Sequence, residues 1–299
     1  MSISASMVKE LRERTGAGMM ECKKALVETD GNMNAAAEHL RKSGQAKADK
    51  KSSRVAADGR VVIKGNGNKA VVVEVNSETD FVAKDENFLA FTDAVADAAL
   101  ASGQTDVAAF ANEALADGRS VEGARTELVA KVGENISVRR IAQIECDGAI
   151  GYYTHGAKIG AVVALEGGDA ELARDIAMHV AAINPSCIDE SGVAAETLEN
   201  ERRILTEQAK DSGKPDEIVE KMVNGRVAKF LKEITLVGQD FVKDPDVTVG
   251  KLLGNAGAKV VAFTRFEVGE GIEKKVENFA DEVMKQIDEA KKKDDESSE

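Results

Sequence analysis

Residues Thr79-Asp80-Phe81-Val82 combine a carboxylate with a large aromatic ring, directly after a β-branched run that predicts a strand. In one interpretation a helix begins here, with Ser77 or Thr79 as its N-cap, Asp80 in its first turn, and Phe81 and Val82 packed inward. In the other, the segment is an exposed turn whose ring and carboxylate contact a partner protein. The residue types alone leave both interpretations open.

The other residues that could do chemistry form no recognisable catalytic motif. The chain contains no GxxxxGK[ST] phosphate-binding run, since Gly250-Lys251 is followed by leucine and lacks the preceding glycine. No HExxH or CxxC companion accompanies any of the three histidines, which are His39, His155 and His179. The sequence therefore predicts no bound metal, no cofactor and no bond chemistry of its own.

Composition restricts the class of protein further. The 299 residues include 40 Lys and Arg against 53 Asp and Glu, a formal net charge of −13, and no Trp. We therefore expect no direct nucleic-acid binding, because phosphate contacts need a cationic face. No apolar run reaches the about 18 residues of a membrane span, and residues 1–9 (MSISASMVK) lack the regions of a secretory signal. With three cysteines and no CxxC spacing, these features predict a cytoplasmic protein.

The elements that must position these residues begin with a compact three-helix unit over residues 4–43. We expect the third helix to end near Gly44, since glycine suits the left-handed position after a helix. Met19 and Met20 are neighbours on the second helix, where side chains point about 100° apart, so one of them is expected to reach solvent or a partner. The basic stretch 44–58 has little to bury and is expected to be a solvated linker.

An internal repeat follows. Residues 58–75 align with residues 147–164 at an offset of 89 (147 − 58), which pairs Val73 with Val162. Each copy predicts a β-hairpin that leads into a helix of small residues. The helices align at an offset of 83, so the second copy is expected to lack six residues (89 − 83) in the connection that holds Phe81 in the first.

Each copy closes with a further strand, over residues 136–144 and 259–267. We therefore expect an α+β fold with a duplicated core, in which each copy is a small antiparallel sheet covered by helix. An antiparallel helical hairpin is expected to project from the second copy, and its apolar positions are Leu198, Leu205, Ala209, Ile218, Met222, Val227 and Phe230. Residues 273–287 predict a final helix, and residues 291–299 have the composition of a disordered tail.

Two segments carry a family resemblance. Residues 11–26 (LRERTGAGMMECKKAL) and residues 74–84 (EVNSETDFVAK) resemble the two signatures of the bacterial elongation factor Ts family. The resemblance extends over essentially the whole chain. It implies a UBA-like N-terminal domain with a basic linker, two core subdomains, a coiled-coil hairpin and a C-terminal helical module, which we place at 1–54, 55–146, 147–277, about 190–234 and 278–299.

The same resemblance implies a function and a set of contacts. Members of the family bind elongation factor Tu in its GDP-bound and nucleotide-free states and accelerate GDP release so that GTP can enter. The resemblance assigns dislocation of the partner's magnesium ion to Thr79, Asp80, Phe81 and Val82. It implies further partner contacts at Met19, Met20, Lys23, Val132, Gly133, His155 and Val242.

Two other classes of function fit parts of the sequence. One is a UBA-type adaptor that binds partner proteins through residues 4–43, and the other is a small-molecule enzyme that uses a cleft of the core. The hairpin at about 190–234 leaves the assembly state open, because such an arm can form a homodimer, a 2:2 complex or a partner contact.

Overall fold

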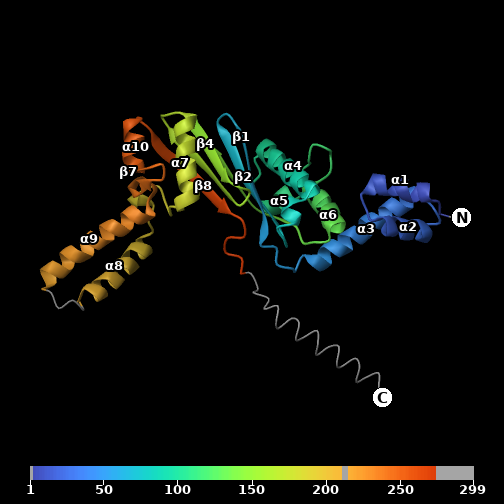
Figure 1. Ribbon diagram of the computed structural model, residues 1–299, viewed down its shortest axis with the longest axis horizontal. Coiled ribbons are helices and arrows are strands. Elements are labelled where there is room, and N and C mark those ends of the chain that lie inside the picture. The colour runs from blue at the N-terminus through green and yellow to red at the C-terminus, as the bar shows by residue number, and fades with distance from the viewer. Residues whose placement is uncertain (1–2, 211–214, 274–299) are drawn as a thin grey trace, which may run out of the picture.

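Two three-stranded antiparallel sheets lie at the centre of an elongated molecule in the computed structural model, which describes residues 3–210 and 215–273 (Figure 1). A three-helix unit lies at one end of the long axis and a helical hairpin at the other. The predicted α+β class with small antiparallel sheets is therefore confirmed.

The N-terminal unit consists of α1 (Ala5–Thr15), α2 (Met19–Glu28) and α3 (Met33–Lys51). The Ser4 side chain caps α1, and Gly16 ends it in the left-handed conformation with a φ of 69°. A small core of its own holds the three helices together and includes Leu11 and Leu26, which are both fully buried. The predicted three-helix arrangement of residues 4–43 is confirmed.

The predicted end of the third helix is wrong, because α3 continues through Gly44 to Lys51. The first part of the expected linker 44–58 is therefore helical. The reason is tertiary: Gly44 and Ala48 are buried and bring α3 against helix α6 (Val121–Val132), where a Cβ on Gly44 would lie 3.5 Å from the Ala130 methyl group. Small residues that pack against another helix, such as Gly44 here, do not end the helix in which they lie.

The first half-core comprises β1 (Asp58–Asn66), β2 (Lys69–Ser77), β3 (Ser137–Glu145), α4 (Glu86–Ser102), α5 (Val107–Phe110) and α6 (Val121–Val132). The second half-core comprises β4 (Ala149–His155), β5 (Ile159–Glu166), β8 (Lys259–Glu267) and α7 (Ala170–Ile183). The sheet orders are β1-β2-β3 and β4-β5-β8, so the middle strand of each sheet is the second strand of its hairpin. Gly67 and Gly156 lie in the two hairpin turns with φ values of 60° and 58°.

The two sheets pack face to face, and a helix covers the outer face of each. Val72 and Val162 lie in the apolar layer between the sheets. Val73 packs outward in the cluster that contains α4, and Val163 packs outward in the cluster that contains α7. The core thus has four layers, with α4 and α7 on the outside (Figure 1).

This packing corrects the alignment of the repeat. Val73 corresponds to Val163 and not to Val162, because both side chains face their covering helix. The hairpin turn is one residue longer in the second copy, since Asn66 pairs with Lys69 but His155 pairs with Ile159. A shift of one residue moves every strand side chain to the opposite face of the sheet.

The length of the missing connection is corrected as well. In the first half-core residues 78–85 join β2 to α4, and in the second residues 167–169 join β5 to α7. The difference is five residues (8 − 3), where the sequence predicted six. A longer connection in the first half-core is nevertheless confirmed.

The helical hairpin, called the arm below, is formed by α8 (Ala195–Lys210) and α9 (Asp216–Ile234). It projects away from the sheets (Figure 1). Its buried seam on α9 is Val219, Val223 and Val227, whereas the predicted apolar position Ile218 is 45% exposed. The helices and the predicted position Val227 are confirmed, but Val219 and Val223 take the places in the seam that were predicted for Ile218 and Met222.

The remaining described elements are short: the 3-10 turns η1 (Val82–Lys84), η2 (Glu190–Gly192) and η3 (Leu236–Gly238), the strands β6 (Asp240–Phe241) and β7 (Asp244–Thr248), and α10 (Val249–Asn255). The predicted helix over 273–287 and the tail over 291–299 lie outside the described residues, apart from residue 273. Among the described residues, no helix is long and apolar enough to cross a membrane.

Candidate functional site

Residues 78–85, called the 78–85 connection, lie between the central strand of the first sheet and its covering helix. Asp85 is the N-cap of α4, and its side chain accepts hydrogen bonds from the backbone N–H groups of Asn87 and Phe88. The interpretation in which Ser77 or Thr79 caps the helix is therefore wrong. The helix begins six residues after Asp80, with the short turn η1 before it.

Phe81 projects from this connection, and its exposed fraction of 81% exceeds that of every other large apolar side chain among the described residues. Val82, its neighbour, is partly buried and packs against the core of the first half-core. The inward interpretation is therefore wrong for Phe81 and correct for Val82. One side chain anchors the turn while the other is presented to solvent.

Asp80 lies beside Phe81 and forms an ion pair with Lys84, with 2.7 Å between Oδ2 and Nζ. The hydrogen bond and the charge of Lys84 hold the pKa of Asp80 below its ordinary value, so the carboxylate is ionised at neutral pH. Exposed aromatic and anionic groups thus stand side by side on the connection.

Thr79 fixes the beginning of the connection through the carboxylate of Glu134. The Thr79 N–H donates to Glu134 Oε2 at 3.0 Å, and the Thr79 hydroxyl donates to Glu134 Oε1 at 2.7 Å. The Ser77 hydroxyl in turn donates to the Thr79 carbonyl at 2.9 Å. Each polar group of Thr79 therefore has a partner in the first half-core.

Glu78 connects the same turn to the segment that follows α6. Its Oε1 accepts a hydrogen bond of 2.6 Å from the Asn135 backbone N–H, and its Oε2 lies 3.5 Å from Arg54 Nη1. The carbonyl of Gly133 accepts a hydrogen bond from Lys51 at the end of α3. The structure thus brings the predicted residues Val132 and Gly133 next to the 78–85 connection.

The turn that follows His155 approaches the same region from the second half-core. Lys158 Nζ donates to Asp58 Oδ1 at 2.9 Å, and the charges of both groups act on the Asp80 carboxylate. His155 itself is exposed, with Nδ1 at 3.4 Å from the Tyr153 hydroxyl. The region around Asp80 therefore combines residues from both half-cores.

The remaining predicted residues lie elsewhere on the surface. Met19 and Met20 are 58% and 73% exposed on α2, and Lys23 is exposed one turn further along. Both methionines reach solvent, whereas the sequence predicted this for one of them. Val242 is 39% exposed directly after β6. No hydrogen bond or ion pair within the described ranges joins these four residues to the 78–85 connection.

The structure adds His179, which the sequence did not assign. This fully buried histidine on α7 accepts the Val242 backbone N–H on Nδ1 at 3.2 Å. Because a backbone N–H can only donate, the neutral ring carries its proton on Nε2 and donates to Gln239 Oε1 at 2.9 Å. Burial lowers the pKa of His179 from its ordinary value. The backbone beside Val242 is thus fixed to the helix that covers the second sheet.

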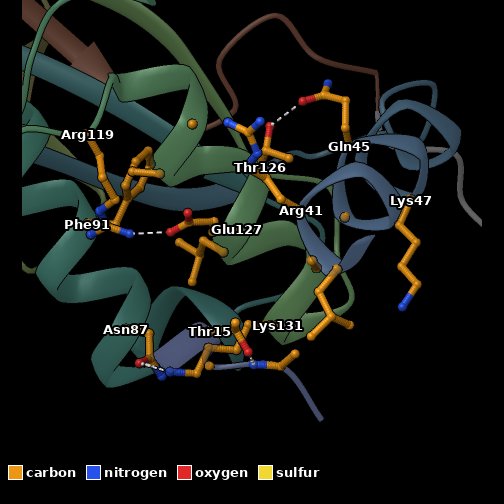
Figure 2. A pocket seen from close by; sticks show the side chains of 18 of the residues that line it. Thr15, Arg41, Gln45, Lys47, Asn87, Phe91, Arg119, Thr126, Glu127 and Lys131 are labelled. Carbon is orange, nitrogen blue, oxygen red and sulfur yellow. Dashed lines mark hydrogen bonds and ion pairs between the residues drawn. The ribbon is translucent and has the colours of Figure 1, made fainter. Parts of the chain in front are cut away.

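A groove of about 1080 Å³ lies between the N-terminal unit and the first half-core (Figure 2). Figure 2 shows Gln45 of α3 facing Thr126 of α6, with a hydrogen bond between their side chains. Elsewhere in the lining Arg119 pairs with Glu127, and Phe91 contributes an apolar surface. Its lining includes neither the 78–85 connection nor the two exposed methionines. Within the described part of the chain, no group of three or more His, Cys, Asp or Glu could hold a metal ion.

Comparison with known proteins decides the family. A family model described as Elongation factor TS matches residues 78–270, which begins at the 78–85 connection and ends at Glu270. The chain belongs to the elongation factor Ts family.

Relatives of the same name match almost the full chain. Elongation factor Ts of Thioalkalivibrio sulfidiphilus is 62% identical over 96% of this chain and 99% of the relative. Those of Legionella pneumophila strain Paris and Alkalilimnicola ehrlichii are 56% and 60% identical with the same coverage. The resemblance seen in the two signatures therefore extends over the whole elongation factor Ts sequence.

Glu134 and Asn135 are residues of the site that the sequence analysis missed. Gly133 ends α6 with a φ of 83°, so the sequence could indicate a helix end at this position. It could not indicate which residues Glu134 and Asn135 contact. The distance in sequence explains the omission, since Thr79 and Glu134 are 55 residues apart. Periodicity reports which face of an element is buried, but not which distant loop it meets.

Proposed function

We propose that the chain is a guanine-nucleotide exchange factor of translation elongation. It binds elongation factor Tu carrying GDP, dislocates the partner's Mg²⁺ and promotes GDP release so that GTP can bind. The observation that carries the proposal is the 81% exposure of Phe81 on a connection that the second half-core lacks. A phenylalanine with no packing role in its own chain is available to enter a partner.

The mechanism requires no bond chemistry. Mg²⁺ and the phosphate-binding backbone hold GDP on the partner. A protein that binds the nucleotide-free partner more tightly than the GDP-bound partner must weaken GDP by the same factor, because binding free energies are reciprocal. Phe81 displaces the elements that support Mg²⁺, and the ionised Asp80 beside it adds rearrangement of charge. Thr79 and Val82 hold these two side chains in place.

Three further surfaces extend the contact. Met19 and Met20 of the N-terminal unit are exposed, and methionine is enriched at protein interfaces; Lys23 lies beside them and adds a charged contact. Val132, Gly133 and His155 contact the partner around the 78–85 connection, and Val242 does so from the second half-core. The complex forms in the cytoplasm.

Release of fluorescent GDP from elongation factor Tu tests the proposal. We expect Phe81→Ala to slow stimulated release at least about tenfold, equivalent to about 1.4 kcal/mol in the barrier. Ile183→Ala is the matched control, because Ile183 is also an exposed apolar residue at 46% but lies on α7. An unchanged release rate for Phe81→Ala at saturating concentration would remove the proposal.

Chelation of Mg²⁺ isolates the metal step. If the 78–85 connection acts by dislocating Mg²⁺, the difference between the parental chain and Phe81→Ala should shrink when EDTA has already removed the ion. A difference that persists at full size in EDTA would show that Phe81 acts on the nucleotide by another route.

A further inference from the structure

We propose that Glu134 is a positioning residue that holds the 78–85 connection in the conformation from which Phe81 projects. This inference rests on the proposed exchange function and concerns a residue outside the two signature segments. Glu134 lies on the loop after α6, and its carboxylate contacts the turn two residues before Phe81.

The two oxygens of Glu134 have separate tasks. Oε2 accepts the Thr79 backbone N–H at 3.0 Å, and Oε1 accepts the Thr79 hydroxyl at 2.7 Å. Hydrogen bonds to a charged acceptor are about twice as strong as neutral ones. Because the hydroxyl proton points to Glu134, the Thr79 oxygen is free to accept the Val82 N–H at 3.4 Å. The carboxylate therefore orients a chain of hydrogen bonds that passes on both sides of Phe81.

Glu134 can act in this way because its own backbone is held from both sides. On one side, the Gly133 carbonyl accepts a hydrogen bond from Lys51. On the other, the Asn135 side chain donates to the carbonyls of Ser52 at 3.3 Å and Arg54 at 2.8 Å. The acceptor is thus fixed to the end of α3 and to the segment that follows it.

The second half-core supplies the contrast. Its connection of residues 167–169 passes directly into α7, where Asp169 caps the helix by accepting the Leu172 N–H at 2.8 Å. A cap within the connection is sufficient there. The longer 78–85 connection has such a cap in Asp85, and in addition it has Glu134 from a different element. Glu134 is therefore an additional acceptor in the half-core that has the longer connection and the exposed Phe81 ring.

The test measures the maximal rate of GDP release from elongation factor Tu with full-length variants. We expect Glu134→Ala to lower this rate at least about fivefold, since Phe81 is no longer held in its position for entry. Glu134→Gln should stay within about twofold, because its amide oxygen can accept the Thr79 N–H while its NH₂ group donates to the Thr79 hydroxyl. Glu145→Ala is the control: Glu145 is another glutamate with a polar partner, Lys69, but it lies at the opposite end of β3.

A double-mutant cycle separates positioning from general stability. If Glu134 acts through Phe81, Glu134→Ala should add less than about twofold to the defect of Phe81→Ala. Thr79→Val, which removes the hydroxyl and keeps the shape, gives a second variant should Glu134→Ala fold poorly. It should slow release in the parental chain and not in Glu134→Ala.

Each outcome has a defined meaning. A normal rate for Glu134→Ala with a slow Phe81→Ala overturns the inference and leaves the exchange function intact. Defects that multiply in the double variant overturn it as well, because Glu134 then acts elsewhere. Normal rates for both single variants contradict the exchange function itself. A Glu134→Gln variant as slow as Glu134→Ala shows that the charge, and not the geometry, is required, which also overturns positioning.

Discussion

The two half-cores solve the same packing problem, and they differ where the first has residues that its own fold does not need. Each has a three-stranded antiparallel sheet whose central strand leads to a covering helix. Between that strand and the helix, the first half-core has the 78–85 connection with Phe81 exposed, and the second has residues 167–169. The shared parts explain the fold, so the differences are where a function is to be sought.

A second difference lies within the central strands. Both strands have a register shift at equivalent positions, between Glu74 and Val75 and between Ala164 and Leu165. The first residue of each pair is fully buried, but one is a carboxylate and the other a methyl group. Glu74 accepts hydrogen bonds from Gly269 N–H at 2.8 Å and from Asn76. It joins the chain after β8 to the first sheet.

Two arginines complete the surroundings of this buried carboxylate. Arg139 Nη1 lies 3.1 Å from Glu74 Oε1, and Arg140 donates to Oε2. Burial alone would raise the pKa of Glu74, but the hydrogen bonds from Gly269, Arg140 and Asn76 outweigh it and hold the pKa below its ordinary value. The half-cores are thus connected by a charge cluster as well as by apolar packing.

The largest expected effect comes from making the first central strand like the second. Glu74→Ala should lower the free energy of unfolding by about 3–5 kcal/mol, because it removes the buried anionic acceptor that Arg139, Arg140 and the Gly269 N–H share. Urea denaturation measures this free energy. Glu145→Ala is the surface control, and it should change the free energy of unfolding by no more than about 0.5 kcal/mol. Since the folded pKa is lowered, the contribution of Glu74 is present at neutral pH and is lost as pH falls through its folded pKa. A loss under about 1 kcal/mol would show that the cluster is dispensable.

Two phenylalanines on either side of Asp85 give the next contrast. Phe88 is fully buried in the first half-core, and Phe81 is 81% exposed. Phe88→Ala should therefore cost about 3–5 kcal/mol, whereas Phe81→Ala should change stability by less than about 1 kcal/mol. Thermal unfolding followed by circular dichroism distinguishes them. An early melt of Phe81→Ala would place that ring in the core after all.

His179 lies ten residues after the N-cap Asp169, and the residue ten after the N-cap Asp85 of α4 is the apolar Val95. His179→Leu should cost about 1–3 kcal/mol, because Gln239 Oε1 and the Val242 N–H lose their partner. The histidine pKa is lowered in the folded state, so the unfolded chain binds more protons below about pH 6.5, and parental stability should fall there. Urea titrations at several pH values should show a shallower fall for the variant. Parallel curves would contradict the lowered pKa of His179 in the folded state.

The N-caps of the two covering helices should contribute equally to the stability of the two half-cores. Asp85 caps α4 and Asp169 caps α7, each by accepting backbone N–H groups of the first turn. Asp85→Ala and Asp169→Ala should each cost about 1 kcal/mol. Denaturant titration of both variants checks this equality. A much larger cost for Asp85→Ala would mean that the cap also supports the 78–85 connection.

The smallest effect on the core is expected from removing the arm, the insertion of the second half-core. Replacing residues 196–227 by a short Gly/Ser loop should leave the cooperative melt of both half-cores within about 1 kcal/mol, because the buried arm residues form a cluster of their own. Scanning calorimetry measures this, and size-exclusion chromatography of the same variant reports whether the arm forms dimers. Loss of cooperative unfolding would make the arm part of the core.

Much of the fold could be predicted because its signals are local. The runs of β-branched and aromatic residues around Gly67 and Gly156 identify both hairpins, and the two glycines adopt the left-handed conformation that such turns need. The predicted alignment of the second strands was wrong by one residue, because the turn of the second hairpin has one more residue than that of the first. A run of Val and Ala looks the same when it is shifted by one position, so the sequence pattern does not reveal this residue. Only the packing of Val73 against α4 and of Val163 against α7 reveals it.

The candidate site divides in the same way. The signature containing Phe81 and Asp80 could be located from sequence, and the shorter second copy indicated that the connection is additional. The direction in which Phe81 points could not be predicted from sequence, since a helix start and an exposed turn use the same residue types. Glu134 and His179 were not predicted at all, because their partners lie 55 and 63 residues away.

The sequence by itself determined the N-terminal helices, the two hairpins with their following helices, the duplication, the arm and the family, because periodicity, turn residues and signature segments are properties of short stretches of chain. The tertiary structure alone decided where α3 ends, which face of each second strand is buried, and how the 78–85 connection is held. In each case a residue distant in sequence supplies the deciding contact: Ala130 for Gly44, the covering helices for Val73 and Val163, and Glu134 for Thr79. The free energy of such contacts depends on three-dimensional proximity, which no local pattern contains.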